Sequence, residues 1–340
     1  MAIPGSDHEK GRLEVEKRVC VLDMGYDSYQ IEEEALAPLG YRLDLFEGGK
    51  LDFASKLAFA RGAEGVFVRW SEFDSYAFDQ LPGLRCLVRC GIGYDNVDLH
   101  AASAHGVKVC NVQGYANHSV SDHALALILS SVRGLPEGMR RLRPGYNHPS
   151  SLHTPELHTL TLGIIGLGRI GGTLCQKALP LFKRVLAYDP YIPSERFTSL
   201  GAASVSMKDL LAQSDVISLH CNLTDETRHM INKEALAFMG PHTILINTAR
   251  GPVVDEDALT EALFSGKIHA AAMDVFADEP PLSNRDDLLS HPRFIATGHY
   301  AWYSNQASRQ LQYRATLNMV AMLRGDTPED CLNRAELGLQ

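Results

Sequence analysis

The chain has 340 residues, of which 45% are hydrophobic and 21% are charged, so it is long enough for two globular domains and too apolar for wholesale disorder. Its formal net charge of −9 lacks the basic footprint of a nucleic-acid-binding protein, and we expect no direct nucleic-acid partner. No apolar run reaches the roughly 18 residues that a transmembrane helix needs, so we expect no membrane association.

Residues 1–16 are polar and mixed in charge. Because they lack the apolar core of a signal peptide, we expect them to form a loose tail of a soluble, cytoplasmic protein. The seven cysteines are odd in number, include no Cys-x-x-Cys pair and fall mostly in apolar runs. This pattern is typical of buried free thiols in a reducing compartment, and neither the cysteines nor the histidines predict a metal site.

The first part of the chain alternates short apolar runs with helix-compatible sequence, including a predicted helix over Ile31–Leu39. Such alternation predicts a parallel sheet that is covered by helices on both faces. The predicted strands are Val19–Asp23, Tyr41–Phe46, Gly65–Trp70, Leu84–Arg89 and Val107–Asn111.

A longer helix is predicted over Ser119–Val132, with Ser121 and Asp122 as capping residues at its start. His118 and His123 beside it are expected to be solvated or to cap the helix. The stretch over residues 143–151 is rich in Pro, Gly and Ser, which is typical of a loop or a domain junction.

After Thr159 the alternation restarts with greater regularity and predicts a doubly wound, nucleotide-binding sheet. The predicted strands are Thr161–Gly166, Arg184–Asp189, Val216–His220, Thr243–Asn247, Ala270–Val275 and Phe294–Ala296. The predicted helices are Arg169–Phe182, Met207–Ala212, Lys233–Phe238 and Glu256–Phe264.

A glycine motif, Gly166-x-Gly168-x-x-Gly171, joins a predicted strand to a predicted helix, and Asp189 ends the next strand. In this context Gly166 permits a tight turn, Gly168 lets the backbone approach a pyrophosphate, and Gly171 lets helix and strand pack closely. Asp189 would bind the adenosine ribose and repel a 2′-phosphate, so the motif predicts NAD rather than NADP. The alternative is a glycine-rich turn in some other α/β protein. The next strand end, at His220 and Cys221, would flank the adenine or the ribose, with Cys221 as a small apolar filler.

Three polar residues follow predicted strands at the sheet edge where α/β proteins bind their ligands: Arg250, Glu279 and His299. Hydride transfer to a carbonyl needs a proton donor, which a histidine with a neighbouring carboxylate supplies, and a cation that holds a carboxylate. Arginine suits the second task because its planar guanidinium binds carboxylates in a bidentate manner. From spacing alone, a structural Arg250–Glu279 ion pair and a hydrogen-bonded loop histidine stay open as alternatives.

Five segments occur in the order found in the D-isomer-specific 2-hydroxyacid dehydrogenase family, which the chain resembles from roughly Gly65 to Arg314. Within that family, the residues from His299 to Ala307 look like the C-terminal-binding-protein branch, in which a tryptophan after the histidine faces the active site. Here that residue is Trp302. The five segments are residues 89–98, the glycine motif, residues 247–251, residues 274–280 and His299.

By this resemblance, His299 is the acid/base, Glu279 is its pKa-setting partner and Arg250 binds the substrate carboxylate and carbonyl. Asp274 would contact the nicotinamide end of the cofactor. The backbone over residues 90–93 would form an anion-binding nest. The expected substrate-binding residues are Arg89, Gly91, Ile92, Gly93, Arg250 and Trp302. The expected cofactor-binding residues are Gly166, Gly168, Arg169, Ile170, Gly171, Asp189, His220, Cys221, Thr227, Thr248, Ala249, Arg250, Asp274 and His299.

The resemblance also implies an α/β fold of two Rossmann-like domains with parallel sheets, of which the first is discontinuous. Residues 1–116 and 300–340 would form the substrate-binding domain, and residues 117–299 the NAD-binding domain. The active site would lie in the cleft between them, and the protein would form a homodimer through the cofactor domain. The chain departs from the family pattern at Gln113, where proline is usual, and at Ala116 and Val120, where cofactor-contacting polar residues are common.

The resulting hypothesis is an enzyme that uses NADH to reduce a small 2-keto acid to the D-2-hydroxy acid, or catalyses the reverse reaction. A second hypothesis is an NAD(H)-sensing co-repressor or interaction protein, which the C-terminal-binding-protein branch suggests. A third, a serine-pathway phosphoglycerate dehydrogenase, is disfavoured because we expect no added regulatory domain and find no evident basic residues for a substrate phosphate.

Overall fold

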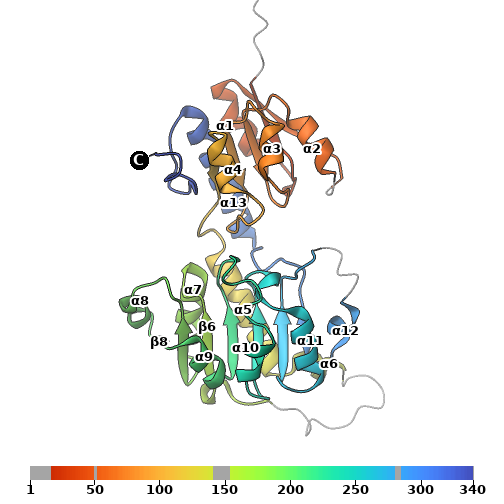
Figure 1. Ribbon diagram of the computed structural model, residues 1–340, viewed down its shortest axis with the longest axis vertical. Helices are drawn as coiled ribbons and strands as arrows, with labels where there is room; N and C mark the ends of the chain where they lie inside the picture. Colours follow the sequence, from red (N-terminus) through yellow and green to blue (C-terminus); the bar gives the residue numbers. More distant parts are fainter. Residues whose placement is uncertain (1–16, 50–51, 141–153, 280–284, 340) are drawn as a thin grey trace, which may run out of the picture. The chain divides into compact units, whose positions relative to one another are not determined.

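The computed structural model describes residues 17–49, 52–140, 154–279 and 285–339 (Figure 1). The chain divides into two compact units, one formed by Met1–Gln113 with Arg309–Gln340 and the other by Gly114–Ser308. The discontinuous unit is called unit 1 below, and the continuous one unit 2. The sequence predicts that the chain passes from the first domain to the second at residues 116/117 and returns at residues 299/300. The tail predicted over residues 1–16 and the junction predicted over residues 143–151 lie outside the described residues.

Unit 1 is built on a five-stranded parallel sheet with the order β2-β1-β3-β4-β5. Each strand overlaps a predicted one. β4 ends at Arg89 as predicted, whereas the other four strands end one or two residues earlier than predicted. β3 stops at Val68 because the amides of Arg69, Trp70 and Ser71 donate to the carboxylate of Asp23 instead of a neighbouring strand. The strands are β1 (Lys17–Val21), β2 (Tyr41–Leu45), β3 (Gly65–Val68), β4 (Cys86–Arg89) and β5 (Lys108–Cys110).

Helices cover both faces of the unit 1 sheet. α2, α3 and α4 share one apolar cluster with the strands, and each begins at an aspartate whose side chain caps it. α13 packs on the opposite face, where a Cβ on Gly65 would lie 2.6 Å from Sδ of Met319. This 20-residue helix was not among the predicted elements. The helices are α1 (Gln30–Leu36), η1 (Ala37–Leu39), α2 (Phe53–Ala60), α3 (Ser75–Asp79), α4 (Leu99–Ala104) and α13 (Asn305–Arg324).

Unit 2 is built on a seven-stranded parallel sheet with the order β12-β11-β10-β9-β6-β7-β8. The order reverses between β6 and β9, which is the switch point where doubly wound sheets bind nucleotides. The predicted nucleotide-binding sheet is therefore confirmed. The strands are β6 (Thr161–Ile165), β7 (Arg184–Tyr188), β8 (Ala203–Ser204), β9 (Val216–Leu219), β10 (Ile244–Asn247), β11 (Ala270–Met273) and β12 (Phe294–Ala296).

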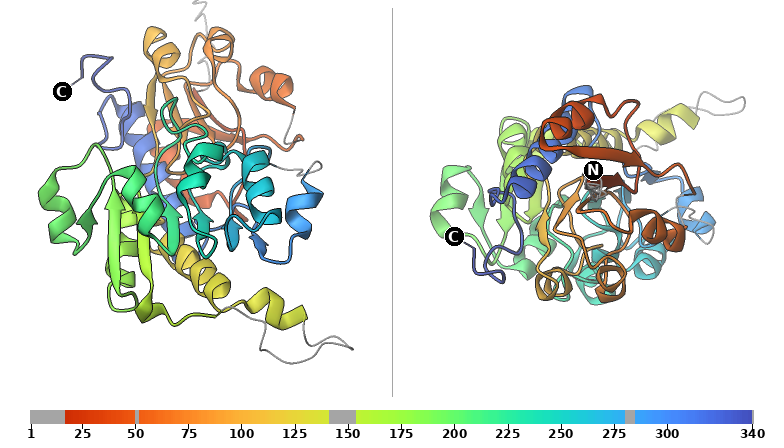
Figure 2. Two further views of the ribbon diagram at one scale, coloured as in Figure 1. Left: turned by 60° about the horizontal axis from the view of Figure 1, so that its bottom comes forward. Right: turned by 90° about the horizontal axis from the view of Figure 1, so that it is seen from above.

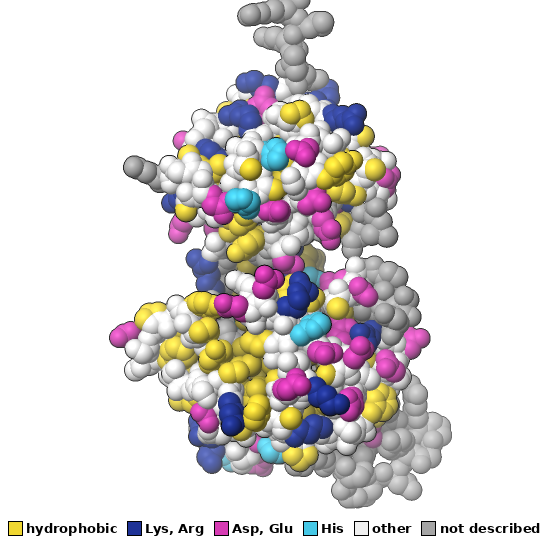
Figure 3. Space-filling model, viewed as in Figure 1, with side chains coloured by type: hydrophobic (Ala, Val, Ile, Leu, Met, Phe, Trp, Pro, Cys, Tyr) yellow, Lys and Arg dark blue, Asp and Glu magenta, His cyan; other side chains and the backbone are white. Residues whose placement is uncertain are grey.

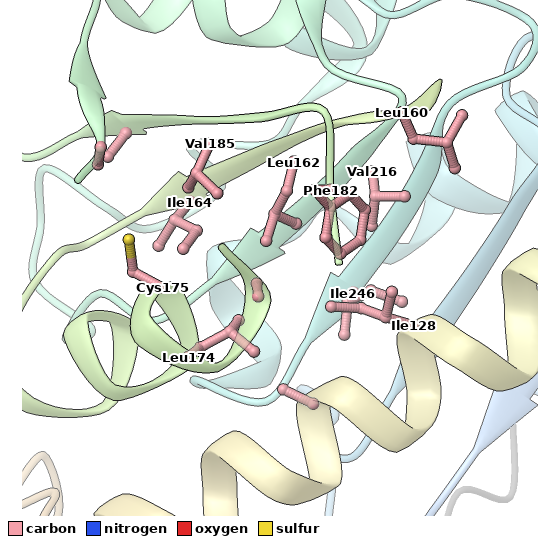
Figure 4. Packing of buried hydrophobic residues seen from close by; sticks show 14 of the residues in the cluster. Ile128, Leu160, Leu162, Ile164, Leu174, Cys175, Phe182, Val185, Val216 and Ile246 are labelled. Carbon is pink, nitrogen blue, oxygen red and sulfur yellow. The ribbon is translucent and has the colours of Figure 1, made fainter. Parts of the chain in front are cut away.

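Two apolar layers enclose the unit 2 sheet. α5, which contacts α7, β10 and β11, covers one face together with α7 and α8 (Figure 2). Ile128 of α5 and Leu174 of α7 point toward Leu162 and Ile164 of β6 in this layer (Figure 4). α9, α10 and α11 cover the other face. The helices are α5 (Asn117–Val132), α6 (Leu135–Arg140), η3 (Leu157–Thr159), α7 (Arg169–Ala178), α8 (Ser194–Ser199), α9 (Met207–Gln213), α10 (Lys233–Phe238), η4 (Gly251–Val253), α11 (Glu256–Phe264) and α12 (Asp286–Ser290).

Two predicted helix ends were wrong. α5 begins at Asn117 rather than Ser119, and Ser121 does not cap it, because its hydroxyl donates back to the carbonyls of Asn117 and His118 inside the helix. α7 stops at Ala178 rather than Phe182, because Pro180 has no N–H with which to continue the helix. No described helix is both long and apolar enough to cross a membrane.

Candidate functional site

The glycine loop joins β6 to α7 and is tight on its inner side and open on its outer side. Gly166 has a φ of +88°, and a Cβ on it would lie 2.7 Å from the backbone nitrogen of Cys221. A Cβ on Gly171 would lie 2.0 Å from the carbonyl oxygen of Gly166, so the close packing predicted for Gly171 is present. A Cβ on Gly168 would meet nothing within 4 Å, and Gly168 and Arg169 are exposed. The outer side of the loop can therefore receive a ligand against bare backbone.

Asp189 follows β7, and its carboxylate is fixed beside the glycine loop. Oδ2 accepts the N–H of Leu167 at 2.9 Å, and Oδ1 accepts the N–H of Tyr191 at 3.0 Å. Each oxygen keeps a second lone pair, so the carboxylate can still accept hydrogen bonds from a ribose.

His220 follows β9, on the other side of the switch point, and Thr248 follows β10. Burial lowers the pKa of His220 to about 4, so its imidazole is neutral near pH 7. One ring nitrogen, Nε2, lies 2.8 Å from Oγ of Ser218. Within the described part of the chain, the buried Nδ1 of His220 and the buried Oγ1 of Thr248 have no hydrogen-bond partner.

Orphaned polar atoms after β9 and β10, in the sheet whose switch point carries the open glycine loop, fit a dinucleotide. Ile170, at the start of α7, is partly exposed. Hydrophobic side chains gather over the part of unit 2 that carries α7, α9 and β6 (Figure 3). Thr227 serves a local purpose, since its hydroxyl donates to the carbonyl of Asn222 at 2.6 Å and accepts the N–H of Thr224 at 2.8 Å.

His299 lies after β12 in a left-handed backbone conformation, with a φ of +56°. Such a conformation is strained in a residue other than glycine and persists only where its surroundings enforce it. The residue that enforces it is Asp274, whose carbonyl accepts the N–H of His299 at 2.7 Å. The buried carboxylate of Asp274 accepts the N–H of Ala301 at 2.8 Å and that of Tyr300 at 3.2 Å.

The imidazole of His299 is paired with Glu279 through Nδ1 and the carboxylate oxygen Oε2. The other carboxylate oxygen of Glu279 accepts the N–H of Phe276 at 2.8 Å. The two side chains are 40% and 27% exposed. Because Glu279 holds Nδ1, the opposite nitrogen, Nε2, is the one that can meet a ligand.

Arg250 follows β10 at the same edge of the sheet. Asn247 fixes the turn, since its side chain donates to the carbonyl of Arg250 at 2.9 Å and accepts the N–H of Ala249 at 3.0 Å. A Cβ on Gly251 would lie 1.9 Å from the carbonyl carbon of Phe276. The arginine turn therefore packs directly on the backbone that holds Glu279.

One positioning residue was missed, and the prediction for it was wrong. His123 of α5 is neither solvated nor a cap, since its side chain is 16% exposed. Nε2 lies 3.0 Å from Oγ1 of Thr297 and 3.5 Å from Oδ1 of Asp274, and the Thr297 hydroxyl donates to the same carboxylate at 2.5 Å. His123 therefore supports the turn that carries His299. Trp302 follows in that turn, with its ring centroid 6.3 Å from that of Tyr115.

The predicted substrate residues Arg89, Gly91, Ile92 and Gly93 belong to unit 1, whereas the other predicted site residues belong to unit 2. Arg89 ends β4, and its Nε lies 3.4 Å from Oδ1 of Asn96. The N–H of Gly91 donates to the carbonyl of Arg89 at 2.9 Å, so it does not face outward as the predicted nest requires. Arg69 follows β3 as Arg89 ends β4, and its guanidinium lies 4.4 Å from the ring centroid of Tyr26.

All seven cysteines are reduced and six of them are buried, with Cys221 partly exposed. Among the residues that the structure describes, no cluster of three His, Cys, Asp or Glu side chains could hold a metal ion.

Comparisons with known proteins give the chain relatives over most of its length. It is 35% identical over 305 residues to a D-3-phosphoglycerate dehydrogenase of Mycobacterium leprae, covering 89% of this chain and 57% of that protein. It is 40% identical over 229 residues to a hydroxypyruvate reductase of Thermotoga maritima, covering 67% of this chain and 74% of that protein. The chain spans only about half the length of the curated phosphoglycerate dehydrogenases that it matches.

Among solved structures, a D-lactate dehydrogenase of Aquifex aeolicus in complex with NAD and lactic acid superposes with a TM-score of 0.81 at 29% identity. The alignment covers 91% of this chain and 96% of that one. Residues 125–301 match the family described as D-isomer specific 2-hydroxyacid dehydrogenase, NAD binding domain. With the glycine loop, Asp189 and the orphaned atoms at this switch point, the chain belongs to the D-isomer specific 2-hydroxyacid dehydrogenase family, and its cofactor is NAD.

Proposed function

We propose that this protein is an NAD-dependent oxidoreductase that interconverts a small 2-keto acid and the corresponding D-2-hydroxy acid. The observation that carries the proposal is the His299–Glu279 pair on a strained turn after β12. This pair and the glycine loop both follow carboxyl ends of strands in one parallel sheet, so they share an edge of that sheet.

NADH, when bound, supplies the hydride. The glycine loop and the start of α7, including Arg169 and Ile170, hold the pyrophosphate, and Asp189 accepts the ribose hydroxyls. His220 and Thr248 offer their unpaired buried atoms to the same ligand. Cys221, Thr227, Ala249, Arg250, Asp274 and His299 complete the proposed cofactor-binding set.

The chain's own residues manage the proton and the substrate's charge. Glu279 accepts from Nδ1 of His299 and orients the ring, and Nε2 delivers the proton to the substrate oxygen during reduction. Arg250 binds the substrate carboxylate and stabilises the negative charge that develops on the carbonyl oxygen. Asp274 and His123 hold the turn in which His299 lies.

The proposed substrate-binding set also includes Arg89, Gly91, Ile92, Gly93 and Trp302. Since the N–H of Gly91 is already donated to Arg89, we assign the carboxylate to the amides of Ile92 and Gly93. The homodimer and the cytoplasmic location expected from the family stay part of this proposal. The relatives named above are dehydrogenases and reductases, which support an enzyme rather than the co-repressor that residues 299–307 suggested.

The test is a substrate screen with the full chain, which follows oxidation of NADH or NADPH with glyoxylate, pyruvate, hydroxypyruvate, bulkier keto acids and phosphorylated keto acids. We expect turnover with NADH and much weaker turnover with NADPH. Tight NADH binding without turnover on the whole panel would contradict the enzyme and leave a sensor.

Two substitutions separate the proton donor from its orienting partner. His299→Asn should lower kcat about 10²–10⁴-fold while NADH still binds, because the proton donor is lost and the glycine loop is intact. Glu279→Gln should lower kcat less than His299→Asn and leave the Kd for NADH unchanged. The matched control is Asp278→Asn, an exposed carboxylate one residue away, which should change neither constant.

A further inference from the structure

Two cysteines of unit 1 face each other across an antiparallel pairing. Cys110 is the last residue of β5, an edge strand, and Cys331 lies in the segment after α13. The two hydrogen bonds that define the pairing run from the N–H of Asn111 to the carbonyl of Asp330 at 3.3 Å and from the N–H of Leu332 to the carbonyl of Val109 at 2.8 Å. Both bonds lie beside the cysteines rather than between them.

This pattern makes Cys110 and Cys331 a non-hydrogen-bonded pair, the class in which Cα atoms are about 4.5 Å apart and side chains are closest. A disulfide needs Cα atoms about 4.4–6.8 Å apart and Cβ atoms about 3.5–4.5 Å apart. The two thiols can therefore be joined by side-chain rotation, without moving the backbone.

The segment that carries Cys331 is held firmly against β5. The side chain of Asn333 accepts the N–H of Val109 at 3.0 Å and donates to the carbonyl of Val107 at 2.9 Å. On the other side of Cys331, the carboxylate of Asp330 accepts from Arg314 of α13 at 3.0 Å. The pair is thus fixed in register from both directions.

The two thiols are also chemically unlike the others. The adjacent Cys110 thiol lowers the pKa of Cys331 and so favours its thiolate, the nucleophilic form. Cys331 is also the more accessible of the two, at 8% exposed against 0% for Cys110. For the remaining five, burial raises the pKa to about 11 or 12 and suppresses the thiolate: these are Cys20, Cys86, Cys90, Cys175 and Cys221.

We propose that Cys110 and Cys331 form an oxidation site that takes a peroxide as its co-reactant and closes to an intramolecular disulfide. The thiolate of Cys331 attacks a peroxide oxygen, the S–O bond forms as the O–O bond breaks, and the departing oxygen takes up a proton to leave as water or an alcohol. Cys110 then attacks the sulfenic sulfur, the S–S bond forms as the S–O bond breaks, and hydroxide leaves with the Cys110 proton as water. Two thiols are oxidised and one peroxide is reduced.

The disulfide would lock the segment at which the chain leaves unit 1. Arg314, which binds Asp330, also donates to the carbonyl of Gln113, and Asn318 donates to the carbonyl of Asn111 at 3.0 Å. Oxidation therefore cross-links the end of β5 to the segment after α13, and α13 already binds both through Arg314 and Asn318. This proposal does not rest on the dehydrogenase activity.

The test treats the full chain with increasing hydrogen peroxide, blocks the remaining thiols with a maleimide and maps the peptides by mass spectrometry. We expect loss of two of the seven thiols, one linked peptide pair containing Cys110 and Cys331, and reversal by dithiothreitol. Hydrogen exchange at Val109–Asn111 should slow on oxidation. Oxidation of other cysteines first, or no linked pair at peroxide concentrations that oxidise glutathione, would overturn the proposal.

Variants assign the two steps. Cys331→Ser should abolish thiol loss at Cys110, whereas Cys110→Ser should leave on Cys331 a sulfenic acid that dimedone traps. Cys86→Ala, in the neighbouring strand β4, is the matched control and should still form the linked pair. Unchanged thiol loss at Cys110 in Cys331→Ser, or no dimedone adduct on Cys331 in Cys110→Ser, would overturn the assignment of the two steps. The mapping on the unmodified chain decides the proposal even if a variant folds poorly.

Discussion

The two sheets of this protein each contain a switch point, between β1 and β3 in unit 1 and between β6 and β9 in unit 2. Such points create a crevice at the carboxyl ends of the strands. In unit 1, side chains of the protein occupy the strand ends, whereas in unit 2 the chain presents glycine backbone. The topology of each sheet therefore creates a crevice, and the local sequence determines whether a ligand can bind in it.

The occupied crevice is organised by Asp23, two residues beyond β1. Its carboxylate accepts from Nζ of Lys56 at 2.7 Å, from Oγ of Ser71 at 2.7 Å, and from the amides of Arg69, Trp70 and Ser71 at 2.8–3.0 Å. Lys56 is itself 2% exposed. In the open crevice of unit 2, by contrast, Nδ1 of His220 and Oγ1 of Thr248 have no hydrogen-bond partner among the described residues.

The largest expected effect comes from breaking the occupied crevice. Lys56→Met should cost unit 1 about 3–5 kcal/mol of unfolding free energy, because it leaves the buried carboxylate of Asp23 without its counter-ion. Hydrogen exchange resolved by peptide should show the loss in β1, β3 and α2, with NADH binding by unit 2 preserved. Lys233→Met, which removes an exposed ion pair with Glu261, is the control and should change little. Equal losses in the two variants would refute the comparison.

A smaller effect is expected from filling the open crevice. Gly171→Ala should cost about 1–3 kcal/mol and weaken NADH binding, because its Cβ would lie 2.0 Å from a carbonyl oxygen that cannot move freely. Gly168→Ala is the matched variant, since its Cβ would meet nothing within 4 Å. We expect Gly168→Ala to keep its stability and lose affinity only. Thermal unfolding and NADH titration separate the two outcomes, and a Gly168 variant as unstable as the Gly171 variant would contradict this geometry.

The unfolding free energy of unit 1 should depend on pH through the ionisation of Asp23. Burial opposes ionisation, but the hydrogen bonds from Lys56 and the amides outweigh it and lower the pKa of Asp23 below its ordinary value. A carboxyl group with a lowered folded-state pKa stabilises the fold above its unfolded pKa, roughly 3.9, and that stabilisation is lost as the pH falls through the folded-state value. Urea unfolding at acid pH should show this loss in the unmodified protein. The loss should be absent in Asp23→Leu/Lys56→Met, and its persistence there would assign it to another group.

The smallest effect is expected at Glu32, a second buried carboxyl group of unit 1. Burial raises the pKa of Glu32, while its carboxylate accepts from Gln312 at 3.0 Å. The sign is opposite to that of Asp23, because ionisation of Glu32 disfavours the fold as the pH rises through its unfolded value. Glu32→Gln should therefore gain on the order of 1 kcal/mol or less at pH 7 and nothing at acid pH. A loss of stability at pH 7 would show that the carboxylate is needed.

The sequence predicted the strands of both sheets because buried parallel strands are short, continuous apolar runs. It also predicted the glycine loop, whose constraints lie within a few residues: the Cβ of Gly171 would clash with Gly166. Arg250 and His299 each follow a strand that the sequence predicts, and the carboxyl ends of parallel strands lie at one edge of a sheet. The sequence could therefore place both residues at that edge.

What the sequence could not predict depends on partners that are distant in the chain. β3 ends at Val68 because its next amides bind Asp23, and His123 is largely shielded from solvent because it meets Thr297 and Asp274. α13 escaped notice because its buried face includes Gln312 and Thr316, which weaken the apolar pattern. Hydrophobic periodicity depends on residues that are close in sequence, so it cannot predict contacts between residues that are distant in the chain.

Because unit 1 consists of two segments that are separated by unit 2 in the sequence, these segments are synthesised at very different times. Strands β1 to β5 emerge before all of unit 2, whereas Met319, which packs against Gly65, and Asn333, which binds the edge of β5, emerge after it. Until then the nascent sheet lacks the cover of α13 and the partner segment at the edge of β5, and exposed sheet surface and unpaired edges promote aggregation. Unit 2, which is continuous, can fold meanwhile. We therefore expect that overproduced chains that stall or are cut before α13 aggregate through the sheet of unit 1, although unit 2 of the same chains is folded.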